Sequence, residues 1–258
     1  MITRSRLRTI GGIALPIIGG MVSQNVVNLV DTAMVGTLGT SALAAVAIGT
    51  YATFLATSVI IGLSSGVQTM VARRIGEGRA NEAAVPLNGG LFLGLLISLP
   101  LIAVAVTFSA DVFALMNNDP DVIEQGVDYL DARLFGILAV GLNFAYRGYF
   151  NGMRLTKVYL YTLLAMHLCN IGLNYVLIFG HFGFPALGAL GAGLASTAAE
   201  YLGVLIFSIL ASPMAPQRGV LSRIPRRETL ATMLPPAVPS APRESPFAGS
   251  LPVHMSIF

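Results

Sequence analysis

The feature that most constrains this chain is a series of apolar runs, each long enough to cross a lipid bilayer. A transmembrane helix needs about twenty consecutive, mostly apolar residues. The connections between the runs are short and rich in Gly, Pro and Asn, as in TLGTS, NNDPD and GHFGFP. We therefore predict an all-α membrane protein in which one bundle of six transmembrane helices is formed by residues 10–35, 43–71, 87–108, 127–149, 158–179 and 187–211.

The composition excludes a soluble domain. Hydrophobic residues make up 55% of the 258 residues and charged residues only 10%, whereas soluble domains carry about a quarter charged residues. The single cysteine, Cys169, excludes an intrachain disulfide and a cluster of thiolate ligands for a metal. The basic residues lie between the apolar runs and form no single patch, so we expect no nucleic-acid partner.

The distribution of charge predicts how the helices cross the membrane. Cytoplasmic loops of membrane proteins are enriched in Lys and Arg. If the N-terminus lies inside and six helices follow, fourteen of the fifteen basic residues are cytoplasmic and only Arg133 lies outside. Six of the twelve acidic residues fall in the outer stretch 111–131. This pattern predicts a multi-pass protein of the cell inner membrane with both termini in the cytoplasm.

The two ends differ in composition from the apolar region, residues 10–211. Residues 1–9 form a basic cytoplasmic leader, and the apolar run that follows is too long for a signal peptide. Residues 212–258 hold nine of the fourteen prolines and contain no run of membrane length. We predict that this C-terminal stretch is a disordered cytoplasmic tail.

The first apolar run carries a carboxylate, which is the strongest indication of function. A charged side chain at the centre of a bilayer costs about 2.5–3.5 kcal/mol on insertion scales, so such residues are functional candidates. Gln24, Asn28 and Asp31 are spaced four and three residues apart, which places them on one helical face. That face cannot contact lipid and must point into the protein.

Three further runs each have a polar face. In the last run Ser196 and Thr197 precede Glu200, and in the fifth His167, Asn170 and Asn174 are spaced three and four apart. The second run carries polar residues at helical spacing: Thr50, Thr53, Thr57, Ser64 and Gln68. Four polar faces predict a water-filled cavity lined by Gln24, Asn28, His167 and Glu200.

Each polar residue also has a purely structural interpretation. Ser and Thr often bond only to a neighbouring helix, at about 0.6 kcal/mol per contact. His167 can be a satisfied interior histidine, and Glu200 can hydrogen-bond a neighbour while protonated. Asp31, with its two amide companions, is harder to explain in this way. We hypothesise that Asp31 takes up a proton or Na⁺ and releases it when the cavity opens to the other side of the membrane.

Glycine and proline positions indicate packing and bending. Small residues four apart allow close approach of helices in lipid, and they recur at Gly62/Gly66, Gly90/Gly94 and Gly148/Gly152. Pro16 predicts a bend or gate in the first helix. Residues 62–66 (GLSSG) also match the G-x-S-x-G nucleophile pattern, but that pattern requires a strand-to-helix turn and this one lies in an apolar helix. We expect no enzymatic activity.

Several motifs resemble one transporter family over residues 7–212. They are Leu15-Pro16 followed by VDTAMVG at 30–36, ARRIGEG at 72–78, YRG at 146–148, and NIGLNY at 170–175. With these motifs the chain resembles the N-terminal half of a multidrug and toxic compound extrusion (MATE) transporter of the DNA-damage-inducible-like branch.

The resemblance implies a fold of two six-helix bundles and efflux of small organic, often cationic compounds in exchange for H⁺ or Na⁺, with no other cofactor. It implies that Asp31 binds the coupling ion, and Asp31 would be a metal ligand only if that ion is Na⁺. Asn170 matches an asparagine of the same site, and Thr197 matches a threonine. Some relatives carry a second aspartate at the position of Asn174, so the missing charge favours H⁺ over Na⁺.

The chain departs from the family in lacking a second bundle. We expect a truncated or frameshifted product, or else a half-transporter that dimerises or pairs with a separate chain. Two alternatives to efflux stay open, namely a non-transporting membrane subunit or inert fragment, and a lipid-linked sugar flippase of the same superfamily.

Overall fold

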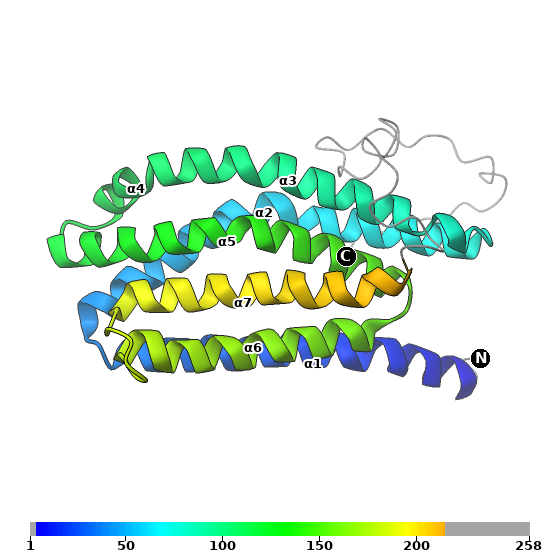
Figure 1. The fold of residues 1–258 in the computed structure, drawn as a ribbon, viewed down its shortest axis with the longest axis horizontal. Helices are drawn as coiled ribbons and strands as arrows, with labels where there is room; N and C mark the ends of the chain where they lie inside the picture. The colour runs from blue at the N-terminus through cyan, green and yellow to red at the C-terminus, as the bar shows by residue number, and fades with distance from the viewer. Residues whose placement is uncertain (1–3, 215–258) are drawn as a thin grey trace, which may run out of the picture.

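The chain forms a bundle of six long helices (Figure 1). The structure is a computed structural model that describes residues 4–214, and no β-strand occurs within that range. The elements are α1 (Arg4–Gly36), α2 (Thr40–Gly76), η1 (Ala80–Glu82), α3 (Ala84–Thr107), α4 (Ser109–Met116), α5 (Pro120–Gly152), α6 (Thr156–Phe179), α7 (Gly188–Ala211) and η2 (Ser212–Met214).

The six predicted helices are confirmed, and most extend a few residues beyond their predicted ends. Each apolar run must satisfy its own backbone hydrogen bonds in lipid, and only a helix does so within one segment. The short helix α4 was not predicted and lies in the expected loop after α3. Residues 4–9 of the predicted leader are the first turns of α1, and residues 215–258 of the predicted tail lie outside the described part of the chain.

Five of the six long helices are long and apolar enough to cross a membrane by themselves. The exception is α5, whose first half carries Asp121, Glu124, Asp128, Asp131 and Arg133. This helix packs against α2, α3, α4 and α7, and its small and aromatic residues are buried. Because neighbouring helices cover α5, it does not need the uniformly apolar surface that lipid demands of an exposed span.

The long helices run up and down in alternation (Figure 1). The N-terminal end of α1, the α2–α3 connection, the α5–α6 connection and the end of α7 lie at one end of the bundle (Figure 1). At the α2–α3 connection, Arg73 pairs with Glu77 at 2.8 Å and Arg79 with Glu82 at 2.6 Å. The hydrogen bond from Arg73 lowers the pKa of the exposed Glu77 carboxyl. Because six long helices alternate in direction, the first and the last end of the bundle lie on the same side, as the alternation of charged loops predicts.

Glycines allow close contacts between helices. This confirms the prediction for two of the three glycine pairs, Gly90/Gly94 and Gly148/Gly152. A Cβ at Gly148 would collide with the backbone carbonyl of Ser64, and one at Gly152 would lie 2.8 Å from the backbone oxygen of Gln68. A Cβ at Gly94 would lie 3.2 Å from the Gly141 backbone. The GLSSG pattern lies inside the continuous helix α2, so it lacks the turn that a nucleophile elbow requires.

Two apolar regions flank the space in which the polar residues gather. The larger one joins α2, α3, α5 and α7, and its aromatic rings stack, with Phe207 5.7 Å from Tyr146 and 5.5 Å from Phe150 between ring centroids. The smaller one includes Val35, Tyr129 and Ile178. Helices α1, α5, α6 and α7 are thereby held around a polar interior.

Candidate functional site

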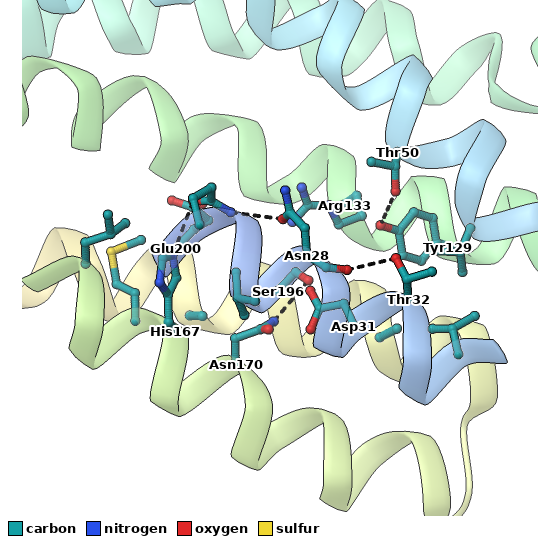
Figure 2. Close-up of a pocket in the computed structure, with 18 residues that line it drawn as sticks. Asn28, Asp31, Thr32, Thr50, Tyr129, Arg133, His167, Asn170, Ser196 and Glu200 are labelled. Carbon is teal, nitrogen blue, oxygen red and sulfur yellow. Dashed lines mark hydrogen bonds between the residues drawn. The ribbon is translucent and has the colours of Figure 1, made fainter. Parts of the chain in front are cut away.

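A cavity of about 240 Å³ lies inside the bundle, and α1, α2, α5, α6 and α7 all contribute to its wall (Figure 2). It collects most of the polar residues that the sequence singled out. The predicted residues that line it are Gln24, Asn28, Asp31, His167, Asn170 and Glu200. The three α1 residues therefore do share one inward face, as their spacing predicts.

Asp31 is held by two amides from α6. The amide nitrogen of Asn174 donates to Asp31 Oδ1 at 2.7 Å. The Asn170 amide has one orientation in which both its nitrogen and its oxygen form hydrogen bonds. In that orientation its nitrogen donates to Asp31 Oδ1 at 2.9 Å, and its oxygen accepts from the Ser196 backbone N–H at 3.3 Å and from the Ser196 hydroxyl at 3.1 Å. Asn174 is fully buried, and its side-chain oxygen has no hydrogen-bond partner. Asn174 lines neither cavity, so it supports the Asp31 carboxylate from behind the cavity wall.

A second polar chain runs along the same face of α1. His167 Nε2 lies 3.2 Å from Gln24 Oε1, and Gln24 Nε2 donates to Asn28 Oδ1 at 3.1 Å. The side chain of His167 is buried, and its Nδ1 atom has no partner. Three predicted lining residues are thus joined in one hydrogen-bonded series beside Asp31.

Glu200 lies between two cavities. Asn143 of α5 donates to Glu200 Oε2 at 2.8 Å and to its backbone oxygen at 2.9 Å. A second cavity of about 180 Å³ shares Gln24 and Glu200 with the first and adds Arg147, whose guanidinium lies 4.8 Å from the Tyr159 ring centroid. Glu200 is therefore a cavity residue with its own amide partner, and Asn143 was missed because it stands alone in an otherwise apolar stretch.

Thr197 does not join the Asp31 cluster. Its hydroxyl donates to the Ala132 backbone oxygen of α5 at 2.7 Å, and the cavity is lined by Ser196 instead. Successive helical residues are turned by about 100°, and here the Thr197 hydroxyl points to α5 while Ser196 faces the cavity. Pro16 lies buried within α1, two helical turns before Gln24, and lines neither cavity. Its role as a bend or gate stays a prediction.

The placement of Ser196 and Thr197 gives a testable contrast. Ser196→Ala removes a partner of Asn170, and if the cavity binds cations as the family resemblance implies, this variant is expected to weaken binding of the fluorescent cation ethidium about threefold. Thr197→Val removes one interhelical hydrogen bond and is expected to cost about 0.6 kcal/mol of stability while leaving ethidium affinity unchanged. Fluorescence titration and denaturant unfolding of purified protein measure both quantities. A larger loss of affinity in Thr197→Val than in Ser196→Ala would contradict the observed orientation.

Sequence reasoning also missed Arg133 and Tyr129. The charge pattern predicts only that Arg133 is the one basic residue outside, yet its side chain lines the cavity that holds Asp31 and Glu200 (Figure 2). Tyr129 and Thr50 share a hydrogen bond of 3.0 Å at the same wall. The sequence does contain one indication that Arg133 could reach a cavity inside the bundle. The uncharged stretch 134–146 follows Arg133 directly and places this arginine at the edge of an apolar run.

The sequence model of the MatE family matches residues 16–176, which include Asp31, Asn170 and Asn174. The chain belongs to the MatE family. It is 30% identical over 194 residues to the "Probable multidrug resistance protein NorM" of Rhizobium meliloti (strain 1021), covering 75% of this chain and 41% of that protein. It is 31% identical over 194 residues to the multidrug resistance protein MdtK of Yersinia pestis (strain Pestoides F), covering 75% and 42%.

Solved structures show the same fold. The outward-facing conformation of a multidrug resistance MATE family transporter of the MOP superfamily superposes with a TM-score of 0.77 at 22% identity, over 88% of this chain and 50% of that one. The eukaryotic MATE transporter AtDTX14 gives 0.74 at 20% identity, over 88% and 50%. This MatE chain thus spans about half the length of the solved structures and about two fifths of the relatives. The predicted family is confirmed, and the DNA-damage-inducible-like branch stays a prediction.

Proposed function

We propose that this chain is the N-terminal bundle of a multidrug efflux transporter, which exports small organic, often cationic compounds in exchange for H⁺ or Na⁺. The observation that carries the proposal is the Asp31 carboxylate, held by Asn170 and Asn174 on the wall of an intramembrane cavity. The relatives named multidrug resistance proteins support the transport class.

The chemistry of the site suits exchange of monovalent cations. An ionised carboxylate in a low-dielectric interior is costly unless a cation or a proton compensates it. Asp31 supplies hard carboxylate oxygen atoms of the kind that a small cation prefers. A proton, a sodium ion and an organic cation would therefore compete for one charge, which is the requirement for antiport. Thr197, bonded to Ala132, is left out of this proposed site.

The proposed cycle needs a second bundle. Transporters of this kind alternate by rocking one bundle against another around a fixed site. The second bundle would be the other half of a longer chain, a second copy of this chain, or a separate protein. The proposed arrangement in the cell is the inner membrane, with both ends of the described bundle facing the cytoplasm.

The site does not favour the flippase alternative. Lipid-linked sugars carry anionic phosphates, and their cavity would need an excess of positive charge. The cavity here holds two carboxylates, Asp31 and Glu200, against one arginine, Arg133.

Ethidium accumulation in cells tests the proposal against an inert fragment. Cells that lack their own drug pumps and express this chain, alone or with the second bundle of a relative, are compared with cells that express the Asp31→Asn variant. We expect at least one pairing to lower ethidium accumulation about twofold or more, and the variant to abolish the effect. Equal accumulation in all strains, with the protein present in the membrane, would favour the inert fragment.

A further inference from the structure

The first cavity contains more charge than a single ion site requires. Its titratable side chains are Asp31 from α1, Tyr129 and Arg133 from α5, His167 from α6 and Glu200 from α7. Helix α2 contributes Val46 and Thr50, neither of which is charged. When both carboxyls are ionised and His167 is neutral, as an ordinary histidine mostly is at pH 7, the two carboxylates and one guanidinium leave a single uncompensated negative charge.

Arg133 faces both carboxylates without being bound by either. Its side chain lines the same cavity as Asp31 and Glu200. Within the described part of the chain it forms no ion pair shorter than 4 Å with them, and its buried Nε atom has no hydrogen-bond partner. Asp31 and Glu200 instead take their hydrogen bonds from asparagines. The positive charge is therefore held in the cavity and shared between the carboxylates.

We propose that Arg133 is a built-in counter-ion that neutralises one of the two cavity carboxylates, so that the cavity accepts one monovalent cation at a time. When Asp31 is free, the compensated pair is Arg133 with Glu200, and Asp31 carries the exchangeable charge. A second cation would meet the guanidinium and be repelled. The stoichiometry would then be one proton or sodium ion against one monovalent organic cation. This step rests on the proposed function, but the charge balance can be measured without any transported compound.

Carbodiimide labelling of the purified chain in detergent tests the charge balance. Dicyclohexylcarbodiimide reacts with protonated carboxyls in apolar surroundings, and peptide mass spectrometry reports labelling of Asp31 at each pH. In Arg133→Gln the lost positive charge favours the protonated carboxyl, so labelling is expected to extend about one pH unit higher, a tenfold gain in proton affinity. Arg133→Lys keeps the charge and is expected to label like wild type.

Arg147→Gln is the matched control. Arg147 lies on the same helix, but it lines only the second cavity and stacks on Tyr159, so Asp31 labelling is expected to stay unchanged. Arg133→Met replaces the Gln variant if the latter does not fold, as judged by its helical circular dichroism.

Each outcome decides the inference. A shift in the Gln or Met variant that is absent in the Lys and Arg147 variants supports it. Identical labelling curves in all variants overturn it, and so does the absence of Asp31 labelling in every variant at every pH. Ethidium binding measured on the same samples separates the two proposals. A labelling shift without ethidium binding would reject the proposed function and leave the counter-ion in place.

Discussion

The Asp31→Asn variant is expected to lose ion-coupled binding of organic cations while keeping its fold. Asparagine has nearly the same shape, and its oxygen can still accept hydrogen bonds from Asn170 and Asn174, whose amide nitrogens lie 2.9 and 2.7 Å from Asp31 Oδ1. The substitution removes the charge that a cation needs. We expect ethidium affinity to fall about 100-fold, or ~2.7 kcal/mol.

The same variant is expected to lose its pH dependence. Under the proposed function a proton and an organic cation compete for Asp31 in the wild-type protein, so acidification is expected to weaken ethidium binding, and binding is expected to release about one proton. In Asp31→Asn neither effect remains, because the amide does not titrate. Calorimetry in two buffers of different ionisation enthalpy counts the released protons, and added NaCl tests whether Na⁺ competes in the same way.

Asp128→Asn is the control for Asp31→Asn. It removes the same charge from an exposed position on α5 that lines neither cavity, so affinity and proton release are expected to match wild type. Unchanged proton release and affinity in Asp31→Asn would reject Asp31 as the coupling residue.

Gly148→Ala is expected to give the largest loss of stability from a single methyl group. The added Cβ would collide with the backbone carbonyl of Ser64 and lie 2.9 Å from the Cβ of Val67. A backbone carbonyl inside a helix cannot move aside as a flexible side chain can, so α2 and α5 would have to separate. Overpacking of this kind costs about 1–3 kcal/mol, and denaturant unfolding in detergent micelles measures it.

Gly172→Ala is the matched control on α6. Nothing lies within 4 Å of a Cβ at Gly172, and alanine is the better helix former by about 1 kcal/mol. We therefore expect this variant to be as stable as wild type or slightly more stable. Equal losses in both variants would mean that Gly148 is not a point of close helix contact.

The helices and the importance of Asp31 could be predicted from the sequence alone. Lipid offers no hydrogen-bond partners to the backbone, so an apolar run of membrane length has to be a helix. The spacing of Gln24, Asn28 and Asp31 then determines that they share a face, and the cost of a charge in lipid determines that this face points inward. These inferences depend only on one helix and its solvent.

The partners of each polar residue were decided by the tertiary structure. Whether Ser196 or Thr197 faces the cavity depends on how far α7 is rotated about its axis, and packing against α5 and α6 sets that rotation. Arg133 enters the cavity because neighbouring helices surround α5, a fact that no single stretch of sequence contains. A rotation of one residue, about 100°, exchanges a cavity residue for a packing residue. For this reason the sequence determines the inward face of α1, while only the assembled bundle determines which residues of the other helices surround the Asp31 carboxylate.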